Sequence, residues 1–159
     1  TYPLPEAQID RFFMKISIGY PSPAEESQIL TKFQYSNPLD RLTPVAIGSD
    51  ISAIQEEGKS VHVDGSINRY IIDIVSQTRR HGDLVLGSSP RGSLSLFKAA
   101  QAWALYNERN YVIPDDVKQM VIPVLSHRLL LKQEAKLKKI SPEEILNSIV
   151  SRTNVPVTN

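Results

Sequence analysis

Three serine–proline pairs constrain the fold of this chain most strongly, because each of them marks the start of a helix. They are Ser22-Pro23, Ser89-Pro90 and Ser141-Pro142. Serine caps the free amides of a first helical turn, and proline, which lacks an amide hydrogen, suits the first helical position. After Ser22 and Ser141, a glutamate at the third following position completes a capping box. The chain is therefore predicted to be mostly helical.

Apolar side chains between these starts recur at the spacing of helices that bury one face. The predicted helices cover residues 6–12, 23–33, 51–57 (capped by Asp50 and ended by Gly58), 66–80 (capped by Asp64), 90–107 and 142–150, and another begins at Pro114 and is kinked or broken at Pro123. Their predicted apolar faces are Ile29, Leu30 and Phe33; Ile67, Tyr70, Ile71, Ile74, Val75 and Thr78; and Leu94, Phe97, Ala100, Ala104 and Leu105.

Other parts of the chain are predicted to lie outside these helices. Met14–Ile18 is rich in β-branched and aromatic residues and predicts a short strand. Residues 35–49 read as a linker, residues 129–140 fit either an extended or a helical segment, and the tail from Thr153 is expected to fray. The predicted fold is a helical bundle with a short N-terminal strand segment.

Charge and composition exclude several function classes. The formal net charge of +1 removes the electrostatic basis for a general nucleic-acid binder. The absence of cysteine excludes disulfides, thiolate zinc sites and a cysteine nucleophile, and it fits a reducing compartment such as the cytoplasm. No apolar run approaches the roughly 20 residues that span a bilayer, so no membrane span is expected.

The usual catalytic motifs are missing from the sequence. It has no G-x-x-x-x-G-K-[ST] phosphate loop, no H-E-x-x-H and no G-x-S-x-G. The histidines (His62, His81 and His127) lack metal-ligand spacing, so no metal site is expected. Asp115 and Asp116 fit the acidic first turn of a helix better than an acid–base pair. The lysines at 132, 136, 138 and 139 are interspersed with acidic residues and fit a solvated face.

Two arginines remain as candidates for phosphate chemistry. Arg11 can pair on the surface with Asp10 or Glu6, and Arg91 can hydrogen-bond nearby carbonyls. Alternatively, either guanidinium can bind a phosphate, for which its planar fork of donors is well suited. Arg91 lies in the first turn of a predicted helix, where a cation opposes the helix dipole.

Two long segments carry a resemblance to a known family. YPLPEAQIDRFFMKISIGYPSPAEESQIL and QTRRHGDLVLGSSPRGSLSLFKAAQAWALYNERNYVIPDDVKQMVIPVLSHRL resemble the C-terminal half of MoxR-type AAA+ ATPases, and the resemblance extends from Tyr2 to about Val150. It implies that residues 1–20 are the end of an α/β core, that 21–152 form the helical lid subdomain, and that 153–159 are a tail. In such proteins the phosphate loop, the acidic magnesium-binding strand and a polar sensor residue precede YPLPEAQ, so this chain is expected to begin just after them.

The resemblance also implies roles for the two arginines. Arg11, in the motif DRF, is similar to the arginine finger, which reaches the γ-phosphate of ATP bound by a neighbouring subunit. Arg91, in the motif SPR, is similar to the second-sensor arginine, which reaches the γ-phosphate in its own subunit, with Ser89 and Pro90 beside the nucleotide. Gly92 stands where a helix former is expected, and glycine loosens a first turn by roughly 0.5–1 kcal/mol relative to alanine.

For the full-length protein, the resemblance implies ATP and magnesium as cofactors. It implies a homo-oligomeric ring, usually a hexamer, that remodels a client protein in a chaperone-like way. The chain alone is expected neither to hydrolyse ATP nor to bind it tightly. A free-standing helical interaction module without any link to ATP is the main alternative, and a helix-turn-helix nucleic-acid binder is disfavoured by the near-zero net charge.

Overall fold

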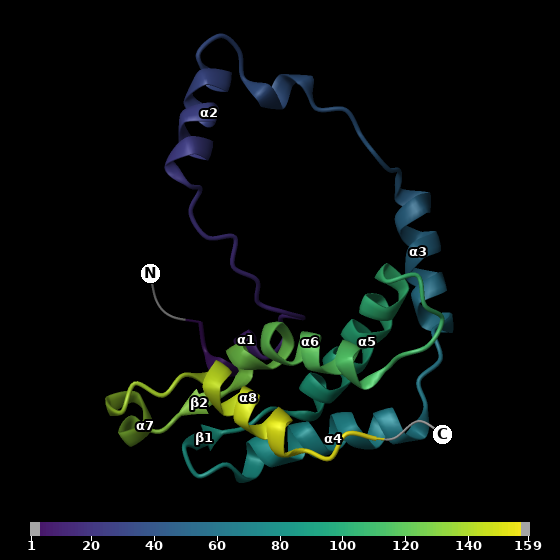
Figure 1. The fold of residues 1–159 in the computed structure, drawn as a ribbon, viewed down its shortest axis with the longest axis vertical. Coiled ribbons are helices and arrows are strands. Elements are labelled where there is room, and N and C mark those ends of the chain that lie inside the picture. Colours follow the sequence, from purple (N-terminus) through teal and green to yellow (C-terminus); the bar gives the residue numbers. More distant parts are fainter. Residues whose placement is uncertain (1–3, 157–159) are drawn as a thin grey trace. The chain divides into compact units, whose positions relative to one another are not determined.

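The computed structural model describes residues 4–156 and is mostly helical, as predicted (Figure 1). Its helices are α1 (Glu6–Ile9), α2 (Pro23–Phe33), α3 (Gly48–Ser60), α4 (Gly65–Arg80), α5 (Pro90–Tyr106), α6 (Pro114–Leu125), α7 (Gln133–Leu137) and α8 (Pro142–Arg152), with short 3₁₀ turns η1 (Pro38–Arg41) and η2 (Ser126–Arg128). Strands β1 (Leu84–Leu86) and β2 (Leu130–Leu131) pair in antiparallel fashion. The start of the resemblance at Tyr2 and the last tail positions, 157–159, lie outside the described residues.

The chain divides into two compact units. Residues 4–15 and 56–156 lie in one of them, here called the larger unit, and residues 16–55 form the smaller unit. The expected boundaries at residues 20 and 152 stay predictions.

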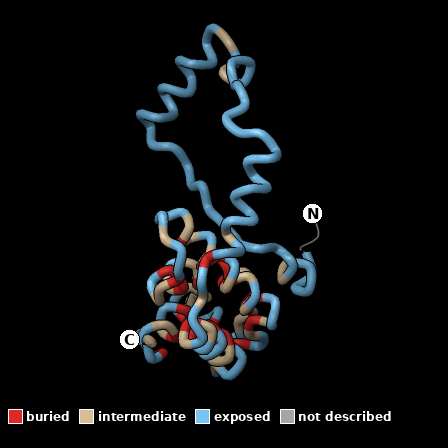
Figure 2. Tube along the Cα trace, turned by 90° about the vertical axis from the view of Figure 1, so that its right-hand side faces the viewer, coloured by how far each residue is buried: buried red, intermediate tan, exposed pale blue. Residues whose placement is uncertain are grey.

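The hydrophobic core lies in the larger unit, where Figure 2 shows the buried residues gathered. Helices α4, α5, α6 and α8 pack around it. The predicted face of α4 is confirmed, since all six of its residues are buried. Removing such apolar area from water is the main favourable contribution to folding. The sequence periodicity therefore located the centre of this unit correctly.

The predicted face of α5 is partly wrong. Leu94 is 57% exposed, whereas Leu96 and Ala99, which were not in the prediction, are buried with Ala100 and Ala104. The buried face of α5 is thus made largely of alanines. Small residues let two helix backbones come close together, and α5 accordingly packs most extensively against α6. Leu94 was a misleading guide because a single exposed leucine is common on protein surfaces.

The strand predicted over Met14–Ile18 does not form, because residues 13–22 have no regular secondary structure. The amide of Lys15 instead donates a 2.8 Å hydrogen bond to the carbonyl oxygen of Pro123, in the last turn of α6. A strand requires a neighbouring strand to pair its backbone groups. Within the described residues, the sheet consists only of β1 and β2, which pair with each other and not with this segment.

Four helix starts follow the predicted capping chemistry. Side chains of Ser22, Asp64, Ser89 and Ser141 accept backbone amides at the starts of α2, α4, α5 and α8. The glutamates after Ser22 and Ser141 close capping boxes, and these amide contacts lower the pKa of both carboxyl groups.

Several helix ends differ from the prediction. Helix α1 stops at Ile9, and α3 begins at Gly48 and continues through Gly58. Asp50 does not cap α3, since its carboxylate reaches back to the amide of Ile47, at 2.9 Å. Pro123 lies inside α6, which ends at Leu125. The ambiguous segment 129–140 contains both an extended piece, β2, and a short helix, α7.

The beginning of the expected tail is anchored rather than frayed. Thr153 is only 8% exposed. Its hydroxyl donates to the backbone carbonyl of Ile149 and accepts from the side-chain amide (Nε2) of Gln77, both at 2.7 Å. The tertiary contact with α4 explains why local composition was misleading here.

The smaller unit has no core of its own. Among residues 16–55, all of which the structure describes, none is buried. The predicted stripe of α2 is therefore exposed, with Ile29, Leu30 and Phe33 at 44%, 70% and 55%. None of the described helices is long and apolar enough to cross a bilayer.

Candidate functional site

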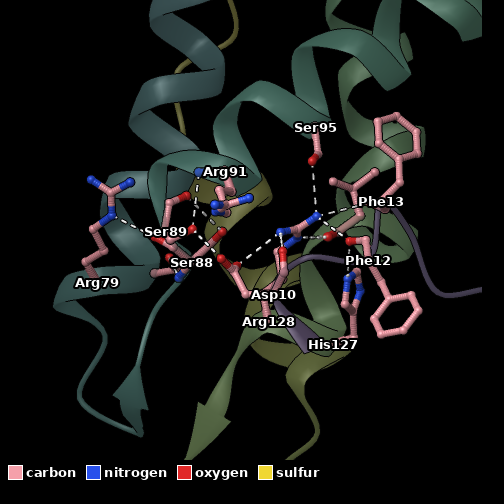
Figure 3. A network of polar contacts seen from close by, with 12 residues as sticks. Asp10, Phe12, Phe13, Arg79, Ser88, Ser89, Arg91, Ser95, His127 and Arg128 are labelled. Atoms are coloured by element: carbon pink, nitrogen blue, oxygen red, sulfur yellow. Dashed lines mark hydrogen bonds and ion pairs between the residues drawn. The ribbon is translucent and has the colours of Figure 1, made fainter. Parts of the chain in front are cut away.

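The turn that precedes Arg91 is fastened to the end of α4. The amide of Ser88 donates to Thr78 Oγ1 at 3.0 Å, and the carbonyl of Ser88 accepts from Arg79 Nε at 2.8 Å (Figure 3). The hydroxyl of Ser89 then caps α5 by accepting the Arg91 amide at 3.2 Å. Contacts on both sides of the turn therefore hold the first turn of α5 in place.

Two glycines allow this close packing. A Cβ atom on Gly87 would lie 2.5 Å from the backbone nitrogen of Arg79, and a Cβ on Gly92 would lie 1.9 Å from Ser88 Oγ. Tertiary packing therefore accounts for glycine at position 92, and the loosening of the first turn stays a prediction. Gly92 is buried, and the absence of its side chain leaves room for the Ser88 hydroxyl.

The two candidate arginines are both exposed. Within residues 4–156, neither guanidinium has an ion pair or hydrogen-bond partner, so the surface pairing of Arg11 with Asp10 or Glu6 does not occur. Arg91 lies at the second position of α5, directly after Pro90. Both guanidinium groups are thus accessible from solvent.

A buried arginine, Arg128, holds the segment that carries Arg11. Its side chain is 1% exposed, and all three of its nitrogens donate hydrogen bonds. Nη2 donates to the carbonyls of Phe12 (2.7 Å) and Phe13 (3.2 Å). Nη1 donates to the carbonyl of Asp10 and, at 3.0 Å, to its carboxylate. Arg128 therefore binds the backbone on both sides of Arg11 (Figure 3).

The same network reaches α5 at two points. The Ser89 hydroxyl donates to Asp10 Oδ2 at 2.8 Å, and Arg128 Nη2 donates to Ser95 Oγ at 3.1 Å. Asp10 directly precedes Arg11, and Ser89 accepts the amide of Arg91. The structure therefore joins the two candidate segments through one hydrogen-bonded cluster, made of Asp10, Ser89, Ser95 and Arg128 and here called the Arg128 cluster. The guanidinium groups of Arg11 and Arg91 are not members of this cluster.

His127 extends this cluster. Its Nε2 lies 3.2 Å from the carbonyl of Phe12, so it is the protonated nitrogen, and Nδ1 is buried without a hydrogen-bond partner among residues 4–156. Burial lowers the pKa of the imidazole, and the nearby charge of Arg128 lowers it further, against the opposing effect of the Phe12 carbonyl. In this position His127 acts as a neutral donor to the backbone.

The remaining candidates have structural positions. Asp116 is 2% exposed and accepts from both terminal nitrogens of Arg109 and from the amide of Ile113. Asp115 is exposed and pairs with Lys118 at 2.8 Å. The lysines at 132, 136, 138 and 139 are all exposed. In the described part of the chain, no group of three or more histidine, aspartate or glutamate side chains could hold a metal ion.

The sequence analysis missed Arg128 and the role of Asp10. A signal was present, because Arg128 follows an apolar helix and precedes the apolar run Leu129–Leu131. An arginine within such a context is buried only if its charge is paired. The partner could not be identified, because Asp10 is more than a hundred residues away in the sequence.

Comparisons with known proteins agree with this fold. Residues 76–149 match the family model of the AAA lid domain. The chain is 48% identical over 157 residues to YeaC, an uncharacterized protein of Bacillus subtilis, and 36% identical over 168 residues to the chaperone MoxR1 of Mycobacterium tuberculosis. These alignments cover 99% and 100% of this chain but 49% and 44% of the relatives. The chain therefore spans about half the length of the curated relatives it matches.

A solved structure is similar to almost the whole chain. It is the crystal structure of a Cytophaga hutchinsonii protein to which ATPase activity is attributed, with a TM-score of 0.90 and 32% identity. The match covers 98% of this chain and 50% of the other. Together these similarities confirm the resemblance that the sequence motifs indicated.

Proposed function

The chain contains an AAA lid domain and resembles MoxR-type AAA+ ATPases over nearly its whole length, and we therefore propose that it is the lid-bearing part of an ATP-hydrolysing, chaperone-like ring protein. The observation that carries this proposal is the position of Arg91. Its exposed guanidinium stands at the held first turn of α5, inside the segment that matches the lid family.

The chemistry required of the two arginines is charge stabilisation. Phosphoryl transfer develops negative charge on the transferred group, and a correctly placed guanidinium lowers the energy of that state. In the proposed ring, Arg91 contacts the γ-phosphate bound by its own subunit, with Ser89 and Pro90 beside the nucleotide. Arg11 contacts the γ-phosphate bound by the neighbouring subunit. The dipole of α5 adds a favourable field for the same anion at its N-terminus, which offsets the unfavourable placement of a cation there.

The residues present fit only half of such a nucleotide site. They supply guanidinium groups, but the described residues contain no carboxylate cluster for magnesium and the sequence contains no phosphate loop. On this proposal, ATP and magnesium are held by another part of the full-length protein, and the chain does not hydrolyse ATP alone.

The partners follow from the same proposal. On this proposal, the full-length protein forms a homo-oligomeric ring in the cytoplasm, a hexamer by analogy with the family, and acts on a client protein. The relative named as the chaperone MoxR1 supports the chaperone-like part of this proposal. The near-neutral charge of the chain gives no support to a nucleic-acid partner.

Substitution of the two arginines in the full-length protein tests the proposal. Arg91→Ala is expected to leave ATP binding largely intact and to lower kcat by roughly 100-fold, the typical effect of losing one charge-stabilising donor. Arg11→Ala is expected to lower kcat by about as much or more. Steady-state phosphate release and nucleotide titration measure both effects.

A matched control is Arg69→Ala, since Arg69 is an exposed arginine on α4, outside the Arg128 cluster. It should leave kcat unchanged. Wild-type turnover in both Arg11→Ala and Arg91→Ala would contradict the proposed function.

A further inference from the structure

Arg128 fixes the position of the segment around Arg11 relative to η2. The Arg128 guanidinium donates to the backbone carbonyl of Val124 in α6 and to three carbonyls of the Arg11 segment, at Asp10, Phe12 and Phe13. Such a fork fixes direction as well as distance. The segment around Arg11 therefore has a defined geometry relative to η2, which carries Arg128.

The same side chain also fixes this segment relative to α5. Arg128 Nη2 reaches Ser95 in α5, and the carboxylate of Asp10 divides its two oxygens between Arg128 and Ser89. Ser89 caps the helix in which Arg91 stands. A displacement of the Arg11 segment must therefore either move the start of α5 or break these hydrogen bonds.

Breaking the cluster is unfavourable because Arg128 is almost completely buried. A buried guanidinium that loses its acceptors leaves an uncompensated charge, which is strongly destabilising. Moving the Arg11 segment and the start of α5 together with η2, which carries Arg128, preserves all of these contacts. The energetics thus favour concerted motion.

Resting on the proposed function, we propose that Arg128 is a positioning residue that couples the Arg11 segment to the start of α5. One buried side chain then determines the positions of both arginines: Arg11, which acts on the neighbouring subunit's nucleotide, and Arg91, which acts on the subunit's own nucleotide. Nucleotide state in one subunit is communicated to the next along this route.

Mixed rings isolate the finger function of a subunit. A full-length subunit whose phosphate loop is inactivated cannot hydrolyse ATP, yet it still offers its Arg11 to a neighbour. Four such subunits are compared at equal doping into wild-type rings: one otherwise unchanged, one with Arg11→Ala, one with Arg128→Lys and one with Arg109→Lys. Lysine keeps the charge at each position and loses the fork.

Arg109→Lys is the matched control. Arg109 also donates from both terminal nitrogens to a buried carboxylate, Asp116, but it lies outside the Arg128 cluster. Ring assembly is verified by light scattering for every mixture. Where Arg128→Lys prevents assembly, Asp10→Asn replaces it, since this change keeps the shape and removes the carboxylate that links Arg128 to Ser89.

We expect the Arg128→Lys subunit to behave like the Arg11→Ala subunit, with phosphate release by its neighbours lowered roughly tenfold or more, as for a misplaced catalytic group. The Arg109→Lys subunit should match the unchanged one. If Arg11→Ala lowers neighbour activity and Arg128→Lys does not, the coupling role is overturned while the proposed function stands. If Arg11→Ala itself has no effect, the trans role in the proposed function fails.

Discussion

At the scale of single residues, the contact between Ser88 and Gly92 determines how closely α5 approaches the turn before it. Ser88 is 1% exposed, and its backbone is bound on both sides by α4. Its hydroxyl oxygen fills the space in which a Cβ on residue 92 would lie. The two residues therefore form one packing unit, and their substitutions should not be additive.

Gly92→Ala alone is expected to destabilise the chain by about 1–2 kcal/mol through overpacking. The double substitution Ser88→Ala with Gly92→Ala removes the obstructing oxygen and adds the helix propensity of alanine, so most of the stability should return. Urea denaturation of both single variants and the double variant measures the coupling. Additive effects of the two changes would contradict the packing unit.

His127 predicts a pH dependence. Its pKa in the fold is lowered from 6.5 by burial, so the unfolded chain binds this proton more readily than the folded one. Stability should be fully present above about pH 6.5 and should decrease as the pH falls towards the lowered value. Thermal melts at pH 7.5 and 5.5 should therefore differ, and His127→Gln should reduce the difference. If His127→Gln shows the same difference between the two pH values as the wild type, the pH dependence arises from other groups.

The residue scale also separates what the sequence could predict from what it could not. The position of Arg91 at a capped helix start followed from the local order Ser89-Pro90-Arg91. The need for Gly92 did not, because it depends on the rotamer of Ser88 and on tertiary packing. Arg128 was missed for a similar reason, since its partners are distant in the sequence.

At the scale of elements, α5 and α6 are joined by a short connection that Asp116 organises. Its carboxylate accepts the amide of Ile113 before α6 and both terminal nitrogens of Arg109 after α5. Hydrogen bonding to Asp116 raises the pKa of Arg109, as expected for a guanidinium held by a carboxylate. The carboxylate therefore serves both as a helix cap and as an interhelical tie.

Asp116→Ala should lower the free energy of unfolding by about 3 kcal/mol, because it leaves Arg109 and an amide without their acceptor. Asp115→Ala is the neighbouring control. Its pair with Lys118 is at the surface, and its loss should change stability by less than about 1 kcal/mol. Chemical denaturation compares the two. Equal losses would mean that burial of Asp116 has no energetic importance.

Elements were predictable where local chemistry determined them. Helix starts depend on capping groups within a few residues, and those at Ser22, Ser89 and Ser141 were predicted. The strand over Met14–Ile18 was wrong because pairing depends on a partner strand, which the described residues do not provide there. Local propensity indicates what a segment can become, while its neighbours decide the outcome.

At the scale of the whole molecule, the two units differ in their sources of stability. The larger unit has a core made of α4, α5, α6 and α8, whereas no residue between 16 and 55 is buried. Helix stability in proteins comes mostly from the packing of an apolar face against other elements. No residue of α2 is buried, so this helix lacks such packing. Helices of the two units should therefore open with very different free energies.

Hydrogen exchange measured by mass spectrometry tests this difference. Amides of α2 are expected to exchange at least about 100-fold faster than those of α4, whose six apolar-face residues are buried. The capping box at Ser22 holds only the first turn and should not alter this order. Comparable protection of α2 and α4 would show that the smaller unit is stabilised by something other than burial.

The binding of Arg128 to backbone carbonyls has a consequence for how sequences in this family diverge. A carbonyl is supplied by every amino acid, so the residues at positions 12 and 13 can be exchanged during evolution while the contact persists. Pairwise covariation, which depends on compensating side-chain changes, would give no signal between these positions and 128. Of the contacts that Arg128 makes with this segment, only the one with the Asp10 carboxylate depends on the identity of a side chain.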